Sequence, residues 1–163
     1  YLGDPEAISL IVSAGQGTLE ERGAGFLYIM YLAQRFGEDV VGRLTRTTRI
    51  GVESVVTETG TPWPDVLSDW WSAVYLDEAV STSGPLSYGD VALRTYLGQP
   101  YPLLPVQLGG GDFTRTGSLP SSAAAYYIVT PGASNSTTFR LGGDGGGQGL
   151  AQGEMRMRIL RVE

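Results

Sequence analysis

Asp65 and Asp69 come closest to catalytic chemistry by residue type and spacing. Residues four apart share one face of a helix, and two neighbouring carboxyl groups can divide the roles of general acid and general base. Acidic residues are also favoured in the first turns of a helix, where they interact well with the helix dipole. We therefore interpret this pair as surface residues near a helix start, and we predict no catalytic residue.

The chain lacks the residue types on which many enzymes depend. Its 163 residues include no His and no Cys, and all eleven basic residues are Arg. The common zinc sites and the Ser-His-Asp and Cys-His nucleophiles therefore cannot be built from this chain. No side chain has an ordinary pKa near neutrality. We predict that the chain is not an enzyme and holds no metal, cofactor or small-molecule ligand.

Several stretches are superficially similar to binding motifs. The Gly-rich stretch 141–153 lacks the Lys-Ser/Thr of a phosphate loop, so we predict a hairpin loop. Gly142–Gly145 is similar to one calcium-binding repeat, but a single copy cannot build stacked turns. The sequon Asn135–Thr137 is too common by chance to indicate glycosylation. A solvated helix face, rather than an anion site, is predicted for Arg43, Arg46 and Arg49.

The charge distribution excludes two classes of partner. The net charge is −6; residues 1–100 hold thirteen acids and six Arg, and residues 101–163 hold four acids and five Arg. Nucleic-acid binding rests on clustered basic residues, and so does docking to anionic lipid. No apolar run approaches the length of a membrane span. We predict neither nucleic acid nor a transmembrane segment, and the first residues lack the pattern of a signal peptide.

A central helix is predicted over residues 19–36. Thr18 and Glu21 fit a capping box at its start, and Gly37 fits a helix stop at its end. One apolar face is predicted from the three- and four-residue spacing of Phe26, Ile29, Met30, Ala33 and Phe36. Gly23 and Gly25 are unexpected inside a helix and indicate close packing against another helix, or close backbone approach to a ligand.

Shorter helices are predicted on both sides of this one. The first opens at Asp4-Pro5-Glu6, where Asp suits the cap and Pro the first turn. Two more follow at 38–47 and 51–59. The last begins at Pro64, after a turn that two prolines make rigid, and reaches about Leu76.

From residue 106 onward the periodicity is two, which is typical of strands. Predicted strands cover residues 106–108, 123–130, 137–141 and 155–162. The predicted fold is therefore α+β: an α-helical domain at 1–98, then a small antiparallel β-sandwich domain at 103–163. A sheet with so few strands has edges to protect, and a strand from a partner could complete it.

The helical half resembles the region that follows the active site in gluzincin-type, hyicolysin (M30)-like bacterial metallopeptidases. The resemblance lies in residues 21–44 and 59–77, including the stretch TGTPWPDVLSDWWSAVYLD. In that family a helix of this form packs behind the zinc helix, and a β domain often follows. The matching positions are Gly23, Ala24, Phe26, Leu27, Tyr31, Leu32, Ala33, Phe36, Gly37, Asp69, Trp70, Tyr75 and Asp77. The family's His-Glu-x-x-His motif has no counterpart here, so no catalytic residue carries over.

We predict a non-catalytic structural or binding module, derived from the C-terminal part of a metallopeptidase-like precursor. It would serve as an accessory subunit of a larger envelope or membrane complex, for example an energy-transducing one, with other protein subunits as partners. The resemblance implies a periplasmic or extracellular location. The alternative is the C-terminal fragment of an active secreted zinc metallopeptidase. A third hypothesis is carbohydrate binding through Phe113, Tyr126 or Tyr127, of which the adjacent tyrosines would face opposite sides of a strand.

Overall fold

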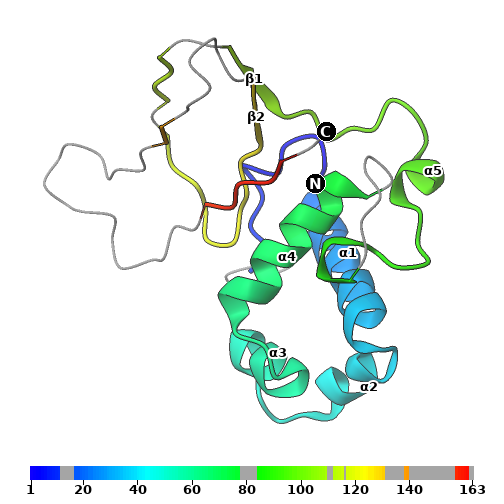
Figure 1. Cartoon of the computed structure of the whole chain (residues 1–163). Coiled ribbons are helices and arrows are strands. Elements are labelled where there is room, and N and C mark those ends of the chain that lie inside the picture. Colours follow the sequence, from blue (N-terminus) through cyan, green and yellow to red (C-terminus); the bar gives the residue numbers. More distant parts are fainter. Residues whose placement is uncertain are drawn as a thin grey trace, which may run out of the picture.

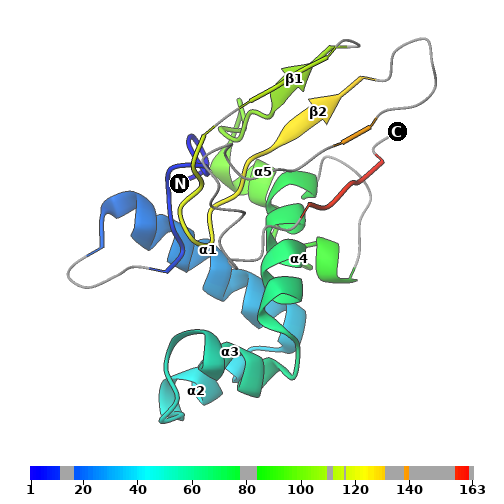
Figure 2. The ribbon, with the colours of Figure 1, turned by 90° about the vertical axis from the view of Figure 1, so that its left-hand side faces the viewer.

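The computed structural model describes residues 1–11, 17–77, 84–109, 112–115, 117–130, 138–139 and 157–161. The elements in these ranges are α1 (Leu19–Phe36), α2 (Asp39–Arg46), α3 (Gly51–Thr59), α4 (Trp63–Leu76), the 3-10 helix η1 (Gly84–Leu86), α5 (Leu93–Leu97), β1 (Val106–Leu108) and β2 (Tyr127–Val129). The long helices α1 and α4 form the centre. Helices α2 and α3 lie at one end of this pair, and the two strands lie at the other (Figures 1 and 2).

The predicted ends of α1 are confirmed. The Thr18 hydroxyl accepts a 3.2 Å hydrogen bond from the Glu21 N–H, and the Glu21 carboxylate accepts one of 2.7 Å from the Thr18 N–H. These bonds satisfy two backbone donors that have no partner within the helix. Gly37 ends the helix at φ 90°, and a Cβ at this position would lie 2.9 Å from Asp39. The positive φ favours glycine here, whereas the Asp39 carboxylate could move aside for a larger side chain.

Helices α2, α3 and α4 lie where the sequence predicts them, within one residue at most ends. The helix predicted at Asp4-Pro5-Glu6 is wrong. Asp4 does accept a hydrogen bond from the Ala7 N–H, at 3.3 Å, but only a turn forms. Beyond this turn the Leu10 N–H donates to Ser122, while the Pro5 carbonyl accepts from Ala124. Backbone groups that a helix would use internally are thus bound to a distant segment.

The core is an aromatic centre between α1 and α4. The Trp70 ring of α4 is fully buried, stacks on Tyr1 at 5.5 Å between centroids, and meets Tyr28 of α1 edge-on at 5.2 Å. Tyr101 and Leu103 belong to the same buried cluster. Aromatic pairs in these geometries add to the free energy gained from burial alone. The clustered rings therefore fix how α1 and α4 cross.

The core-facing side of α1 differs from the predicted one. Its buried side chains are Ala24, Leu27, Tyr28, Tyr31 and Leu32. Of the residues predicted to face the core, Met30 and Phe36 pack only partly against it, and Phe26 and Ile29 are exposed. The helix carries apolar residues on both sides, and its tyrosines supply the apolar surface that the core uses.

The predicted antiparallel β-sandwich is wrong. In the described part of the chain, β1 and β2 form one two-stranded parallel sheet, with Val106 opposite Tyr127 and Leu108 opposite Val129. Strand β2 covers only the end of the predicted strand 123–130, because the N–H groups of Ala123 and Ala124 donate to the Pro120 and Pro5 carbonyls instead of to β1. No strand forms at 138–139 or 157–161, and the rest of those predicted strands lies outside the described residues. Alternation of apolar and polar residues indicates a strand, but it does not indicate whether the strand pairs in parallel or antiparallel with its neighbour.

Candidate functional site

The two candidate carboxylates, Asp65 and Asp69, lie four residues apart on α4 in different surroundings. The Asp69 carboxylate is bound by the Arg158 guanidinium, which also lies 3.4 Å from the Ser68 hydroxyl. Asp65 is exposed on the same helix. Asp69 is thus committed to an ion pair and is only partly exposed, whereas Asp65 lies at the surface. No three carboxylates gather into a possible metal site among the described residues.

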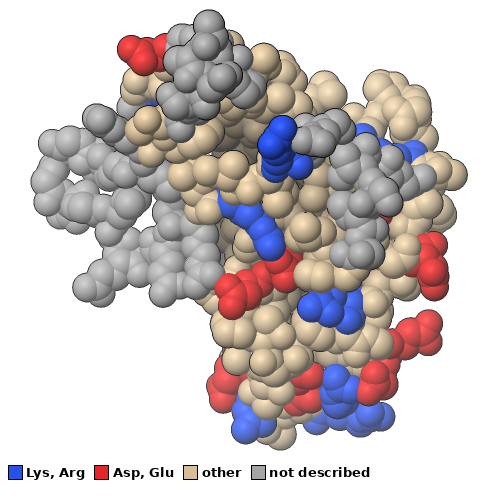
Figure 3. All heavy atoms as spheres, viewed as in Figure 1, with Lys and Arg blue, Asp and Glu red and all other residues tan. Residues whose placement is uncertain are grey.

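Two of the three arginines of the predicted solvated face, Arg43 of α2 and Arg49 after it, form ion pairs. Arg43 contacts the carboxylates of Asp39 and Glu58, and Arg49 lies 3.2 Å from Glu53. Figure 3 shows basic and acidic side chains interspersed over α2 and α3. This pattern is that of a solvated, mixed-charge surface, and exposed pairs of this kind contribute little to stability.

Neither interpretation of Gly23 and Gly25 receives support from their surroundings. A Cβ built at either position meets no heavy atom within 4 Å among the described residues. Close packing against a neighbouring helix would bring such atoms nearer. The predicted loop 141–153 and the sequon Asn135–Thr137 lie outside the described residues.

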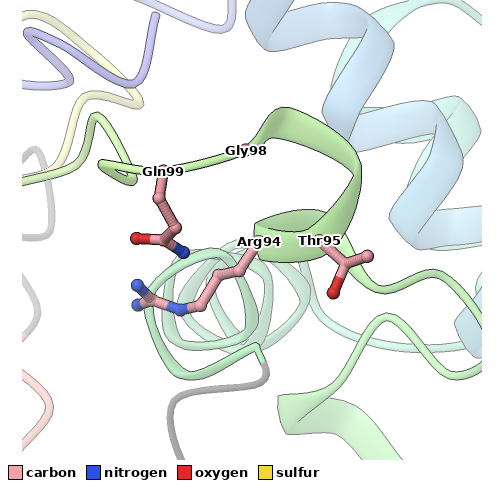
Figure 4. Close-up of a pocket in the computed structure, with 4 residues that line it drawn as sticks. All are labelled: Arg94, Thr95, Gly98 and Gln99. Atoms are coloured by element: carbon pink, nitrogen blue, oxygen red, sulfur yellow. The ribbon is translucent and has the colours of Figure 1, made fainter.

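A hollow of about 330 Å³ lies beside α5 and is lined by Arg94, Thr95, Gly98 and Gln99 (Figure 4). Its charged group is already engaged. Arg94 donates 2.6 Å hydrogen bonds to the carbonyls of Asp77 and Tyr75, and its guanidinium lies 4.1 Å from the centre of the Tyr101 ring. These carbonyls end α4, where helical partners are missing. Arg94 is therefore a helix cap.

The α1 helix presents large apolar side chains to solvent. Leu19 is 74% exposed, Phe26 63% and Ile29 40%. Their spacing of seven and three residues places them on one side, opposite the buried Leu27 and Tyr31. We call these three residues the outward face of α1. The spacing of Phe26 and Ile29 did predict an apolar face on this side of the helix. We expected that face to pack into the core, whereas the structure leaves it exposed.

A second exposed group forms where the chain start meets the segment before β2. The Glu6 carboxylate is bound by the Arg115 guanidinium and accepts a 3.4 Å hydrogen bond from the Tyr127 hydroxyl. Arg115 also donates to that hydroxyl at 3.2 Å and lies over its ring at 5.8 Å. The bond to Glu6 raises the pKa of Arg115 above its ordinary value. The Phe113 ring lies 6.3 Å from that of Tyr127.

We call these four residues the Glu6–Tyr127 cluster. The adjacent tyrosines of the carbohydrate hypothesis do face opposite sides, as predicted. Tyr126 turns inward, with its hydroxyl 3.0 Å from the Trp71 carbonyl and its ring beside Tyr75. Glu6 and Arg115 were not predicted, because 109 residues separate them and only the fold brings them together.

Comparison with protein-family models, with curated proteins and with solved structures finds no match to this chain. The metallopeptidase resemblance therefore stays a prediction that rests on the residues quoted for it. Within the described ranges, no helix has the combined length and apolar character that a bilayer crossing requires.

Proposed function

We propose that this chain is a non-catalytic binding module that docks onto another protein through the outward face of α1. The observation that carries the proposal is the exposure of Leu19, Phe26 and Ile29 on one side of the helix. Fully burying a large apolar side chain contributes roughly 1.5–3 kcal/mol. Grouped large apolar side chains on a surface are typical of interaction sites.

A partner that packs on this side would give α1 two apolar interfaces, one with α4 and one with the partner. The wider proposal keeps the accessory role: an exported subunit of an envelope or membrane assembly, in the periplasm or outside the cell. That location rests on the resemblance alone.

The test compares partner capture by the wild-type chain and by Phe26→Asp, using extracts of the cells that produce the protein. We expect a defined partner that is retained by the wild type and lost with Phe26→Asp. The matched control is Tyr96→Asp, which changes an aromatic residue that is 81% exposed on α5. Equal unfolding midpoints of the variants would show that both fold. A chain that stays monomeric at all concentrations, with no partner sensitive to Phe26, would refute the proposal.

The same face favours a second candidate, the C-terminal fragment of a secreted zinc metallopeptidase. Among the positions that carry the resemblance, Leu27 and Tyr31 are buried against the core, while Phe26 lies on the outward face of α1. In that family a zinc helix packs against this helix, so a catalytic unit would be the occupant. A His-Glu-x-x-His motif upstream in the same reading frame, with peptidase activity that Phe26→Asp abolishes, would favour this candidate.

A further inference from the structure

The Glu6–Tyr127 cluster combines exposed aromatic rings with fixed polar groups. Phe113 is 50% exposed and Tyr127 39%. Their ring planes meet at 58°, so the rings form an angled pair rather than a flat stack. Apolar C–H groups of a ligand gain from contact with such rings, while the Tyr127 hydroxyl offers a polar partner beside them. This pairing suits ligands that have both an apolar face and hydroxyl groups.

The polar groups are held in place and retain capacity for hydrogen bonds. Each oxygen of the Glu6 carboxylate has one partner, Arg115 for one and the Tyr127 hydroxyl for the other. A carboxylate accepts more bonds than these two, and a guanidinium has more N–H groups than the two that Arg115 uses in the cluster. Side chains fixed before binding lose less entropy when a ligand arrives. The cluster therefore presents ordered acceptors and donors at an aromatic surface.

Glu6 also lines a hollow of about 410 Å³, together with Asp4, Ala7, Ser118 and Pro120. This hollow is shallow and widely open to solvent, so it adds polar groups beside the rings rather than an enclosed pocket. The two carboxylates of Asp4 and Glu6 outnumber the one guanidinium of Arg115. Because like charges repel, this balance disfavours sugar acids and other anions.

We propose that the Glu6–Tyr127 cluster and the adjoining hollow bind the pyranose ring of a neutral saccharide. The C–H face of the ring lies against Phe113 and Tyr127, and its hydroxyls bond to Glu6, Arg115 and the hollow's polar groups. This site is separate from the outward face of α1, so either proposal can fail without the other.

The test is binding of defined oligosaccharides to the whole chain, followed by saturation-transfer NMR and titration calorimetry. The neutral probes are chitohexaose, cellohexaose and maltohexaose, which separate N-acetylated glycans from plain glucans. Tetragalacturonate is the anionic probe. We expect at least one neutral probe to bind and the anionic probe not to bind. Absence of binding by all three neutral probes, or tighter binding of tetragalacturonate, would overturn the proposal.

Variants locate the site. Phe113→Ala is expected to lower the association constant about tenfold or more, as loss of an aromatic anchor does. Tyr127→Phe keeps the ring and removes only the hydroxyl, so it should lower the association constant only a few fold. Tyr96→Ala is the control for loss of an exposed aromatic residue, and it should leave the association constant unchanged. Undiminished binding by a folded Phe113→Ala variant would overturn the proposal.

Discussion

The indole N–H of Trp70 donates a 2.8 Å hydrogen bond to the hydroxyl of Tyr88, and both groups are buried. The same hydroxyl donates to the Leu27 carbonyl at 3.2 Å. One oxygen atom therefore links α4, α1 and the loop that follows η1. A buried donor without a hydrogen-bond partner destabilises the folded state, because it has lost its bonds to water and gained none in return.

Tyr88→Phe should lower the free energy of unfolding by about 1–3 kcal/mol, because it leaves the Trp70 N–H buried without a partner. The ring and its edge contact with Tyr31 are kept, so the change isolates the hydroxyl. Urea unfolding monitored by fluorescence measures the loss. Tyr96→Phe, on the exposed surface of α5, is the control and should change nothing. Equal stabilities for the two variants would show that the link is dispensable.

The same substitution at Tyr28 should have the opposite or no effect. Tyr28 is buried, and its hydroxyl has no hydrogen-bond partner among the described residues. Removing an unsatisfied buried polar group is neutral or stabilising, by up to about 1–2 kcal/mol. Tyr28→Phe keeps the edge contacts of the ring with Trp63 and Trp70. Urea unfolding beside Tyr88→Phe provides the comparison, and a loss of stability at Tyr28 would point to a partner of that hydroxyl.

Stability should fall as the pH rises above about 10, the ordinary pKa of tyrosine. Burial raises the pKa of Tyr28 and of Tyr88 well above this value. Between the unfolded and folded pKa values the folded state binds more protons, so the free energy of unfolding decreases with pH. Below pH 10 this contribution is fully present. At pH 11 the loss is of the order of 1 kcal/mol for each buried tyrosine.

The composition limits side-chain titration in this range to the tyrosines, because the chain has no Lys, His or Cys and arginine keeps its charge. Burial also raises the pKa of Tyr1, Tyr31 and Tyr126, so these residues share in the decline. Urea midpoints between pH 8 and pH 11 measure the effect. The double variant Tyr28→Phe/Tyr88→Phe should show a shallower decline than the wild type. An unchanged slope in the double variant would assign the decline to other groups.

Local signals predicted α1, α2, α3 and α4, but they failed at Asp4-Pro5-Glu6 and did not indicate α5. The cap formed by Thr18 and Glu21 and the stops at Gly37 and Gly60 depend on a few neighbouring residues. Which side of α1 is buried depends on α4 instead, since Phe26 and Leu27 are both apolar and only their partners differ. The periodicity of α1 therefore predicts that a helix forms, but it does not predict which side of the helix faces the core.

The strand direction and the Glu6–Tyr127 cluster could not be predicted for a related reason. Alternation at Val106–Leu108 and Tyr127–Val129 predicts strands, but their parallel pairing comes from the path of the chain between them. That path also carries Arg115 to Glu6. No local rule links residues so far apart. The carbohydrate hypothesis named Phe113, Tyr126 and Tyr127 by residue type alone, whereas an ion pair such as Glu6–Arg115 can be recognised only when both partners are in place.

Arg94→Lys should lower the free energy of unfolding by about 1–3 kcal/mol, although the charge is kept. The guanidinium bonds the Asp77 and Tyr75 carbonyls at the end of α4 and lies over the Tyr101 ring. A lysine ammonium is a compact point charge. It cannot bind both carbonyls and lie flat over the Tyr101 ring at the same time, as the planar guanidinium does. Lost hydrogen bonds to buried carbonyls set the size of the effect. Arg49→Lys is the matched control, because its pair with Glu53 is exposed and should tolerate the change. Urea unfolding of both variants measures the difference, and equal stabilities would mean that Arg94 does not act as the cap of α4.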